Sequence, residues 1–205
     1  MSRGGSNSYT WATNNPDKVS CIYADNPAPG KPWAFRASYV TSDALVDLDL
    51  LSEGFHVITG PCPTNTDGLL LEHWNSVYQF FTDQGFSKKP VLEGDGAALG
   101  EACGWAIENP DKVSCLYGEN PVFRSFITKK PLLENLSILA RAEIPIILVS
   151  ESLDPWYADN TIAAEKQYIK FGGRIKVITK EGTGHYLLAP ELVDPVVVLL
   201  IKYLK

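Results

Sequence analysis

Three loops of this sequence carry side chains that could take part in catalysis, and each loop follows a predicted strand. Residues 151–156 read ESLDPW, and a carboxylate in this position could orient a histidine. Residues 181–185 read EGTGH, in which the glycines let His185 project with little hindrance from the backbone. Residues 94–98 read GDGAA, and such small residues permit the tight strand-to-helix turn on which some hydrolases present a nucleophile.

The elements that must position these loops alternate between strands and helices. Strands are predicted at 33–40, 56–59, 90–93, 113–118, 144–150 and 174–179. Helices are predicted at 42–53, 67–84, from the Gly/Ala-rich turn at 94–100 to 109, and at 132–143, 159–171 and 191–204. The helix at 42–53 is expected to place Leu45, Leu48 and Leu51 on one face.

Strands separated by helices imply right-handed βαβ crossovers. We therefore expect a single α/β domain, in which a mainly parallel sheet is covered by helices on both faces. In such a sheet the carboxyl ends of the strands meet at one edge, which would bring the three loops together.

The composition is that of an ordinary globular domain and excludes several other classes. The chain has 205 residues, 45% of them hydrophobic, which is enough for one domain with a sizeable core. A net charge of −6 without a basic stripe argues against nucleic acid as a partner, and no apolar run has the roughly 20 residues of a membrane helix. The first ten residues lack the apolar core of a signal peptide, so we expect a cytoplasmic protein. The four cysteines have no CxxC spacing, which predicts neither a disulfide framework nor a metal site.

A long internal repeat sets the N-terminal part of the chain apart. Residues 11–27 (WATNNPDKVSCIYADNP) and 105–121 (WAIENPDKVSCLYGENP) are identical at 12 of 17 positions, at a constant offset of 94. Both copies read as a helix end, an Asn-Pro turn and a strand. One extra copy excludes a solenoid and indicates a partial duplication, either without functional meaning or with a structural role. The chain thus divides into 1–29, a duplicated copy of the segment 95–121, and a core at 30–205.

The order of the three loops, with the small-residue turn first, the acid second and the histidine last, is that of α/β-hydrolases. Together with 30–39 (GKPWAFRASY), 50–57 (LLSEGFHV), 91–94 (VLEG) and the repeated NPDKVSC, it resembles a bacterial α/β-hydrolase-fold family of esterase-like proteins over 30–205. The resemblance implies a hydrolase-type sheet and neither a metal nor an organic cofactor. It makes His185 the base of a catalytic triad and Asp154 its acid, with Glu151 as the alternative acid.

The sequence departs from this family at the nucleophile. The family's turn reads Gly-X-Ser-X-Gly, and a gapless alignment places Gly96 at the serine position. Glycine has no side chain, so serine-type acyl transfer cannot start there. Asp95, one residue earlier, could act as a carboxylate nucleophile if the turn were shifted, or it could simply cap the following helix. Extending the repeat backwards places Ser2 on Gly96, so the duplicated copy carries the Ser-Arg-Gly-Gly that the family shows at an active turn.

Two interpretations of the duplicated copy follow. In the first, residues 19–24 form a strand at the sheet edge and replace the N-terminal strands usual in the family. In the second, the copy docks near His185 and Asp154, in the same chain or in a partner chain, and supplies Ser2 as the nucleophile.

Other side chains have expected roles around this site. The backbone N–H groups near Arg36 and Ala37 lie where the family contributes to an oxyanion hole. Trp156 and Tyr157 are candidates for lining a substrate pocket. Only 122–131 stand where many hydrolases carry a cap, so the site is expected to be open. The remaining residues of interest are expected to be structural: Trp33, Phe35, His56 and His73.

Two functions of different classes are compatible with these observations. The first is the hydrolysis of a small acyl ester or lactone, with His185 as general base, Asp154 fixing its tautomer, and Ser2 or Asp95 as nucleophile. Direct activation of water by His185 and Asp154 would be a slow variant of it. The alternative is a catalytically inactive relative with a degenerate triad, which binds a small molecule or a partner because residue 96 is glycine. Strand edges left exposed at the trimmed N-terminus would favour a homodimer.

Overall fold

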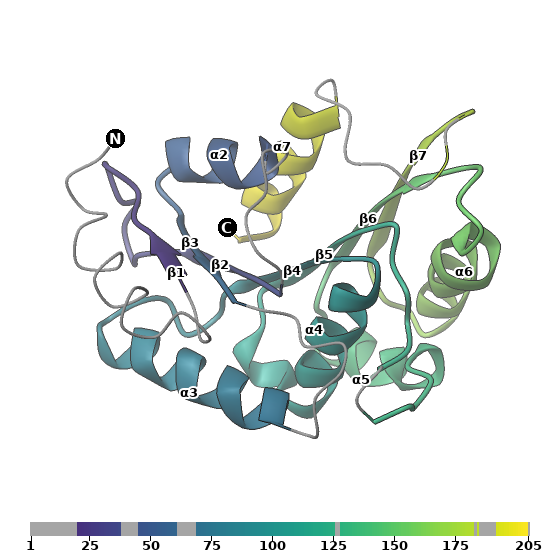
Figure 1. The fold of residues 1–205 in the computed structure, drawn as a ribbon, viewed down its shortest axis with the longest axis horizontal. Coiled ribbons are helices and arrows are strands. Elements are labelled where there is room, and N and C mark those ends of the chain that lie inside the picture. Colours follow the sequence, from purple (N-terminus) through teal and green to yellow (C-terminus); the bar gives the residue numbers. More distant parts are fainter. Residues whose placement is uncertain are drawn as a thin grey trace.

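A seven-stranded sheet forms the centre of the computed structural model (Figure 1), which describes residues 20–37, 45–60, 69–125, 128–182, 184 and 192–204. In chain order the strands are β1 (Ser20–Ile22), β2 (Trp33–Arg36), β3 (His56–Thr59), β4 (Val91–Asp95), β5 (Cys115–Glu119), β6 (Ile146–Glu151) and β7 (Ile175–Lys180). Their order in space is β1-β3-β2-β4-β5-β6-β7. Strands β2 to β7 are parallel and β1 is antiparallel to β3, which confirms the predicted α/β architecture.

Helices cover both faces of this sheet, as predicted (Figure 1). One face is covered by α3 (Leu69–Asp83), α4 (Ala97–Glu108), α5 (Leu136–Arg141) and α6 (Ala163–Lys170), and the other by α2 (Leu45–Ser52) and α7 (Val193–Leu204). Short 3-10 turns lie at Pro110–Lys112 and Leu133–Asn135, and a π-helical stretch, Tyr157–Ile162, precedes α6. No helix in the described part of the chain is long and apolar enough to cross a membrane.

Side chains of each strand alternate between two hydrophobic cores. Strand β2 shows this clearly, because Trp33 and Phe35 pack on one face and Ala34 packs on the other. The ring of Phe35 lies 4.3 Å from that of Trp74 in α3, measured between centroids. The prediction that Trp33 and Phe35 belong to the core is therefore confirmed.

The duplicated segment forms an edge strand, as the first of the two interpretations predicted. Its Ser-Cys-Ile becomes β1 and pairs only with β3 among the described strands, whereas the matching Cys115 and Leu116 of the internal copy begin β5 in the middle of the sheet. His56 holds the chain just after β1 in place, because its Nδ1 accepts a hydrogen bond from the Ala24 N–H at 3.2 Å. His56 is buried and thus structural, as expected. His73 lies in α3, but its side chain is outside the described residues.

Helix α2 buries other side chains than the three leucines that were expected to share one of its faces. Leu48 is 57% exposed, and the buried side chains are those of Val46, Asp47 and Leu50. The leucine spacing suggested an apolar stripe, but a buried aspartate needs a partner, and Asp47 has one in the sheet below it. The helix is therefore rotated toward that partner.

Candidate active site

A strained turn follows β4, where the sequence predicted a nucleophile to be presented. Strand β4 runs through Asp95, Gly96 makes the turn alone with φ 50° and ψ −119°, and α4 begins at Ala97. The tight turn is thus confirmed, although the predicted Gly/Ala-rich turn at 94–100 is shorter than expected, because residues 97–100 form the first turn of α4. We call residues 94–98 the elbow.

Two features hold the elbow in this shape. The Gly96 N–H donates to the Glu119 carbonyl at 2.9 Å, and the Val122 N–H donates to the Gly96 carbonyl at 3.0 Å. In addition, a Cβ at position 94 would lie 2.5 Å from the backbone nitrogen of Leu99, so glycine is required where α4 folds back over β4. Residue 96 therefore occupies the apex of a strand-to-helix turn of the kind that presents nucleophiles, and it carries no side chain.

Asp95 is the last residue of β4 and lies one residue before the apex. In the parallel register Asp95 is opposite Glu119. Because successive side chains of a strand point to opposite faces, Asp95 faces the same side of the sheet as Glu93. The shifted turn that would carry Asp95 to the apex is not formed. The simpler expectation also fails, because Gly96 is the N-cap of α4 and no side chain caps this helix.

The loop after β6 holds the predicted acid. Asp154 is buried, and its Oδ1 accepts a hydrogen bond from the Trp156 N–H at 2.6 Å. Its own N–H donates to the Glu151 carbonyl at 3.1 Å, so the carboxylate is oriented by a tight turn. Glu151, the alternative acid, is the last residue of β6 and is buried, with an Oε2 that has no hydrogen-bond partner among the described residues. We call residues 152–156 the acid loop.

The elbow and the acid loop lie at the same edge of the sheet and are linked through β5. The Asn120 N–H donates to the Val149 carbonyl at 2.8 Å, and the Glu151 N–H donates to Asn120 Oδ1 at 3.0 Å. The loop after β7 starts beside the acid loop, since the Gly182 N–H donates to Ser152 Oγ at 3.0 Å. His185, three residues further along, lies outside the described residues, as does Ser2.

The Ala37 N–H does not make the predicted contribution to an oxyanion hole. The Ala37 N–H donates to the Glu93 carbonyl at 2.9 Å and is therefore part of the sheet. The Arg36 side chain is buried in an ion pair. A sheet hydrogen bond between parallel strands cannot at the same time serve an oxyanion, so any such donor must come from a residue other than Ala37.

The surface beside Asp154 is apolar and open. Trp156 and Leu153 are 54% and 66% exposed, while the Tyr157 hydroxyl lies 2.9 Å from Thr179 Oγ1. Trp156 thus has the exposure that a substrate-contacting residue needs, whereas the hydroxyl of Tyr157 is engaged with the sheet. A cavity of about 620 Å³ lies at the opposite edge of the sheet. It is lined by residues that lie at or just before the amino ends of the strands.

Within the described part of the chain, neither a thiol nor a metal site offers an obvious substitute for the missing serine. Burial raises the pKa of Cys21 to about 12 and also raises the pKa values of the Cys103 and Cys115 thiols, so these groups stay protonated. Among the described residues no group of three or more His, Cys, Asp or Glu side chains is arranged to hold a metal ion.

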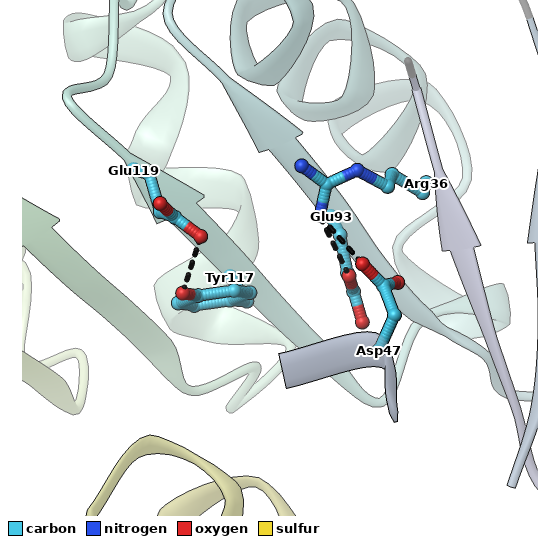
Figure 2. Close-up of polar contacts among 5 residues, drawn as sticks. All are labelled: Arg36, Asp47, Glu93, Tyr117 and Glu119. Atoms are coloured by element: carbon cyan, nitrogen blue, oxygen red, sulfur yellow. Dashed lines mark hydrogen bonds and ion pairs between the residues drawn. The ribbon is translucent and has the colours of Figure 1, made fainter. Parts of the chain in front are cut away.

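The sequence analysis missed one group of functional interest, a buried ion cluster formed by Arg36, Asp47 and Glu93 (Figure 2). An Arg36 Nη1 lies 2.9 Å from Asp47 Oδ2 and 3.8 Å from Glu93 Oε2. The alternation of Trp-Ala-Phe-Arg and Val-Leu-Glu along two strands could have placed Arg36 and Glu93 on one face of the sheet.

A mainly parallel sheet with an elbow after a central strand and an acid loop two strands away defines the α/β-hydrolase fold. The comparisons agree. The structure of Est1E from Butyrivibrio proteoclasticus superposes with a TM-score of 0.69 at 13% identity, over 90% of this chain and 93% of that one. The esterase domain of a Rhodothermus marinus protein gives 0.66 at 11% identity, over 92% and 100%. A predicted CIB-like hydrolase from Thermoplasma acidophilum gives 0.62 at 18% identity, over 90% and 91%. No protein-family model and no curated sequence matches the chain.

Proposed function

We propose that this protein is an esterase-type hydrolase that acts on a small acyl ester or lactone at the carboxyl ends of β4, β6 and β7. The observation that carries the proposal is the elbow, which keeps the backbone conformation of a nucleophile-presenting turn after its serine position has become glycine. The buried Asp154 at the same sheet edge supports it, because a triad acid belongs in this loop. Two proteins that share the fold are described as an esterase domain and a carboxylesterase.

In this proposal His185 is the general base and Asp154 fixes its tautomer. Because residue 96 cannot form an acyl-enzyme, we assign the attack on the ester to a water molecule that His185 activates. Such a site should be slow, since triads that have lost a member retain only about 10³–10⁴-fold catalysis over water. Asp95 and Ser2 remain the alternative nucleophiles, and each can be tested by substitution.

A second candidate function is the binding of a small molecule or partner without turnover. Gly96 favours it, because the missing side chain is the one that serine hydrolases need for covalent catalysis. Natural proteins often keep a fold while changing its activity, so a retained elbow does not by itself require an enzyme.

The test is the hydrolysis of a series of p-nitrophenyl esters by the wild type and by Ser2→Ala, Asp95→Asn and His185→Ala. The proposal predicts slow hydrolysis that only His185→Ala abolishes. Loss of activity in Ser2→Ala or Asp95→Asn would instead identify that residue as the nucleophile. Turnover that no variant changes, or no turnover above that of buffer, would leave the binding function as the better description.

Two further expectations from the sequence remain proposals. A homodimer would suit the outer strand β7, which pairs only with β6 among the described strands and whose residues are half-exposed or exposed. A cytoplasmic location is proposed from the composition and the cysteine spacing.

A further inference from the structure

The buried ion cluster holds more negative than positive charge if all its members are ionised. Arg36, at the end of β2, carries one positive charge, while Asp47 on α2 and Glu93 on β4 carry two carboxyl groups. Figure 2 shows both carboxyl groups turned toward the guanidinium. Glu93 is 0% exposed and Asp47 1%, so solvent does not screen the excess negative charge. A buried charge without a partner is costly, which makes two full carboxylates beside one arginine an unfavourable arrangement.

A single proton resolves this excess. If both groups were carboxylates, Asp47 Oδ1 and both Glu93 carboxyl oxygens would lack a hydrogen-bond donor among the described residues. A proton on Glu93 lets that side chain donate to Asp47, whose other oxygen already receives the Arg36 bond at 2.9 Å. Burial and then the Asp47 charge raise the pKa of Glu93 well above its ordinary 4.5, although Arg36 opposes the shift.

The other titratable groups near Glu93 do not supply a compensating positive charge. Asp95 lies two residues along the same strand, and Glu119 on β5 adds to the negative field. Tyr117 on β5 donates its hydroxyl to Glu119 Oε1 at 2.8 Å (Figure 2), and burial keeps it and the nearby Cys115 protonated.

The cluster joins the two strands on which the proposed site depends. Glu93 lies three residues before Gly96, and its carbonyl accepts the Ala37 N–H at 2.9 Å. Arg36 ends β2 and lies opposite Glu93 in the parallel register of β2 against β4. Asp47 adds α2 to the same unit, so a strand end, a helix and the elbow strand are held together at one point.

We propose that Arg36, Asp47 and Glu93 form a positioning unit, in which one proton is shared between the two carboxyl groups and the end of β2 is held in fixed relation to the elbow. The positioning role rests on the proposed esterase function. The shared proton does not, and it can be tested without any activity.

The first experiment measures thermal stability against pH for the wild type, Glu93→Gln and Glu134→Gln. Glutamine imitates a protonated glutamate, and Glu134 is an exposed carboxylate that serves as the matched control. The folded wild type keeps the Glu93 proton, whereas the unfolded chain releases it above about pH 4.5. The contribution of this proton to the stability is therefore complete below that pH and is lost as the pH rises toward the pKa of Glu93 in the folded protein. The Tm of Glu93→Gln minus the Tm of the wild type should therefore increase by about 3–5 °C per pH unit in that range. The shared proton would be refuted if the Tm difference between Glu93→Gln and the wild type varied with pH as little as that of Glu134→Gln. It would also be refuted if Glu93→Gln lowered the Tm by on the order of 10 °C at neutral pH.

The second experiment measures kcat and KM for p-nitrophenyl acetate in the wild type, Asp47→Asn and Glu134→Gln. Asp47→Asn removes the charge that orients Arg36 and should lower kcat about tenfold or more while KM stays within about twofold, as for a loss of transition-state geometry. A melting curve is used to verify that the variant is still folded at the assay temperature. Equal kcat in a folded Asp47→Asn refutes the positioning role, whereas a wild type without any hydrolysis refutes the proposed function and leaves the first experiment valid.

Discussion

If the proposed function is correct, placing a serine at residue 96 should strongly accelerate ester hydrolysis. The backbone at this position already has φ 50° and ψ −119°, so the substitution adds a hydroxyl to an existing elbow and needs no rearrangement of the strand or the helix. Asp154 is buried and oriented in the neighbouring loop. The added Oγ would supply the nucleophile of the proposed triad.

The size of the effect can be bounded from both sides. A side chain at a positive φ costs about 1–3 kcal/mol, which corresponds to a fall in Tm of roughly 2–12 °C for a chain of this size. In serine proteases the loss of the nucleophile lowers kcat about 10⁶-fold. Because the rest of this site has not been selected together with a serine, we expect Gly96→Ser to recover only part of that factor, about 10²-fold or more in kcat/KM.

The assay is the hydrolysis of p-nitrophenyl acetate, combined with mass spectrometry after treatment with a fluorophosphonate that labels activated serines. Gly96→Ala is the matched control, because it bears the same backbone strain without the hydroxyl. The reasoning is refuted if Gly96→Ser is folded, hydrolyses no faster than Gly96→Ala, and takes up no label at residue 96. A label on another residue would equally show that the elbow apex has been assigned wrongly.

Further predictions concern the elbow, the acid and a buried histidine. Gly94→Ala should destabilise the protein by about 1–3 kcal/mol in urea denaturation because its Cβ would lie 2.5 Å from the Leu99 nitrogen, whereas Gly104→Ala, with nothing within 4 Å, should stabilise it by about 0.5–1 kcal/mol. Asp154→Asn, made in the Gly96→Ser protein, should lower kcat by about 10² in the same ester assay, which returns it to the residual level of a triad that has lost a member; an unchanged rate would exclude Asp154 as the triad acid. Burial, and then the Lys31 charge, lower the pKa of His56 below its ordinary 6.5, so its contribution to stability is complete above that pH and is lost as the pH falls. His56→Asn should flatten the change in urea midpoint between about pH 8 and about pH 5, and a change as steep as in the wild type would contradict this.

The local elements of this fold were predictable from the sequence because their signals are local. The strand at 56–59 was predicted at the bounds that the structure has, and the strands around 33, 91, 115, 146 and 175 were found within a few residues of their ends. Short apolar runs between glycine, proline and helix-capping residues specify such strands without reference to the rest of the chain. The repeat also identified β1, because a segment that forms a strand in one copy tends to form one in the other.

Interactions between distant residues were not predictable in this way. The leucines of α2 suggested one buried face, yet Asp47 is buried and Leu48 is exposed, because Arg36 lies beneath the helix in the folded protein. Ala37 was expected to serve an oxyanion hole, but the register of β2 against β4 directs its N–H to the Glu93 carbonyl. Both outcomes depend on which strands become neighbours, and no local pattern contains that information.

The sequence by itself determined the α/β class, the order of the turn, the acid and the histidine along the chain, and the absence of a side chain at residue 96. Only the tertiary structure decided that Gly96, and not Asp95, stands at the apex of the elbow, because the hydrogen bond from its N–H to the Glu119 carbonyl and the close approach of Leu99 to Gly94 set the point where β4 ends. It also decided that two carboxyl groups far apart in sequence share one arginine where neither carboxyl group is exposed to solvent. The types of residues are written in the chain, but their environments, and with them the chemistry that they can perform, come from packing.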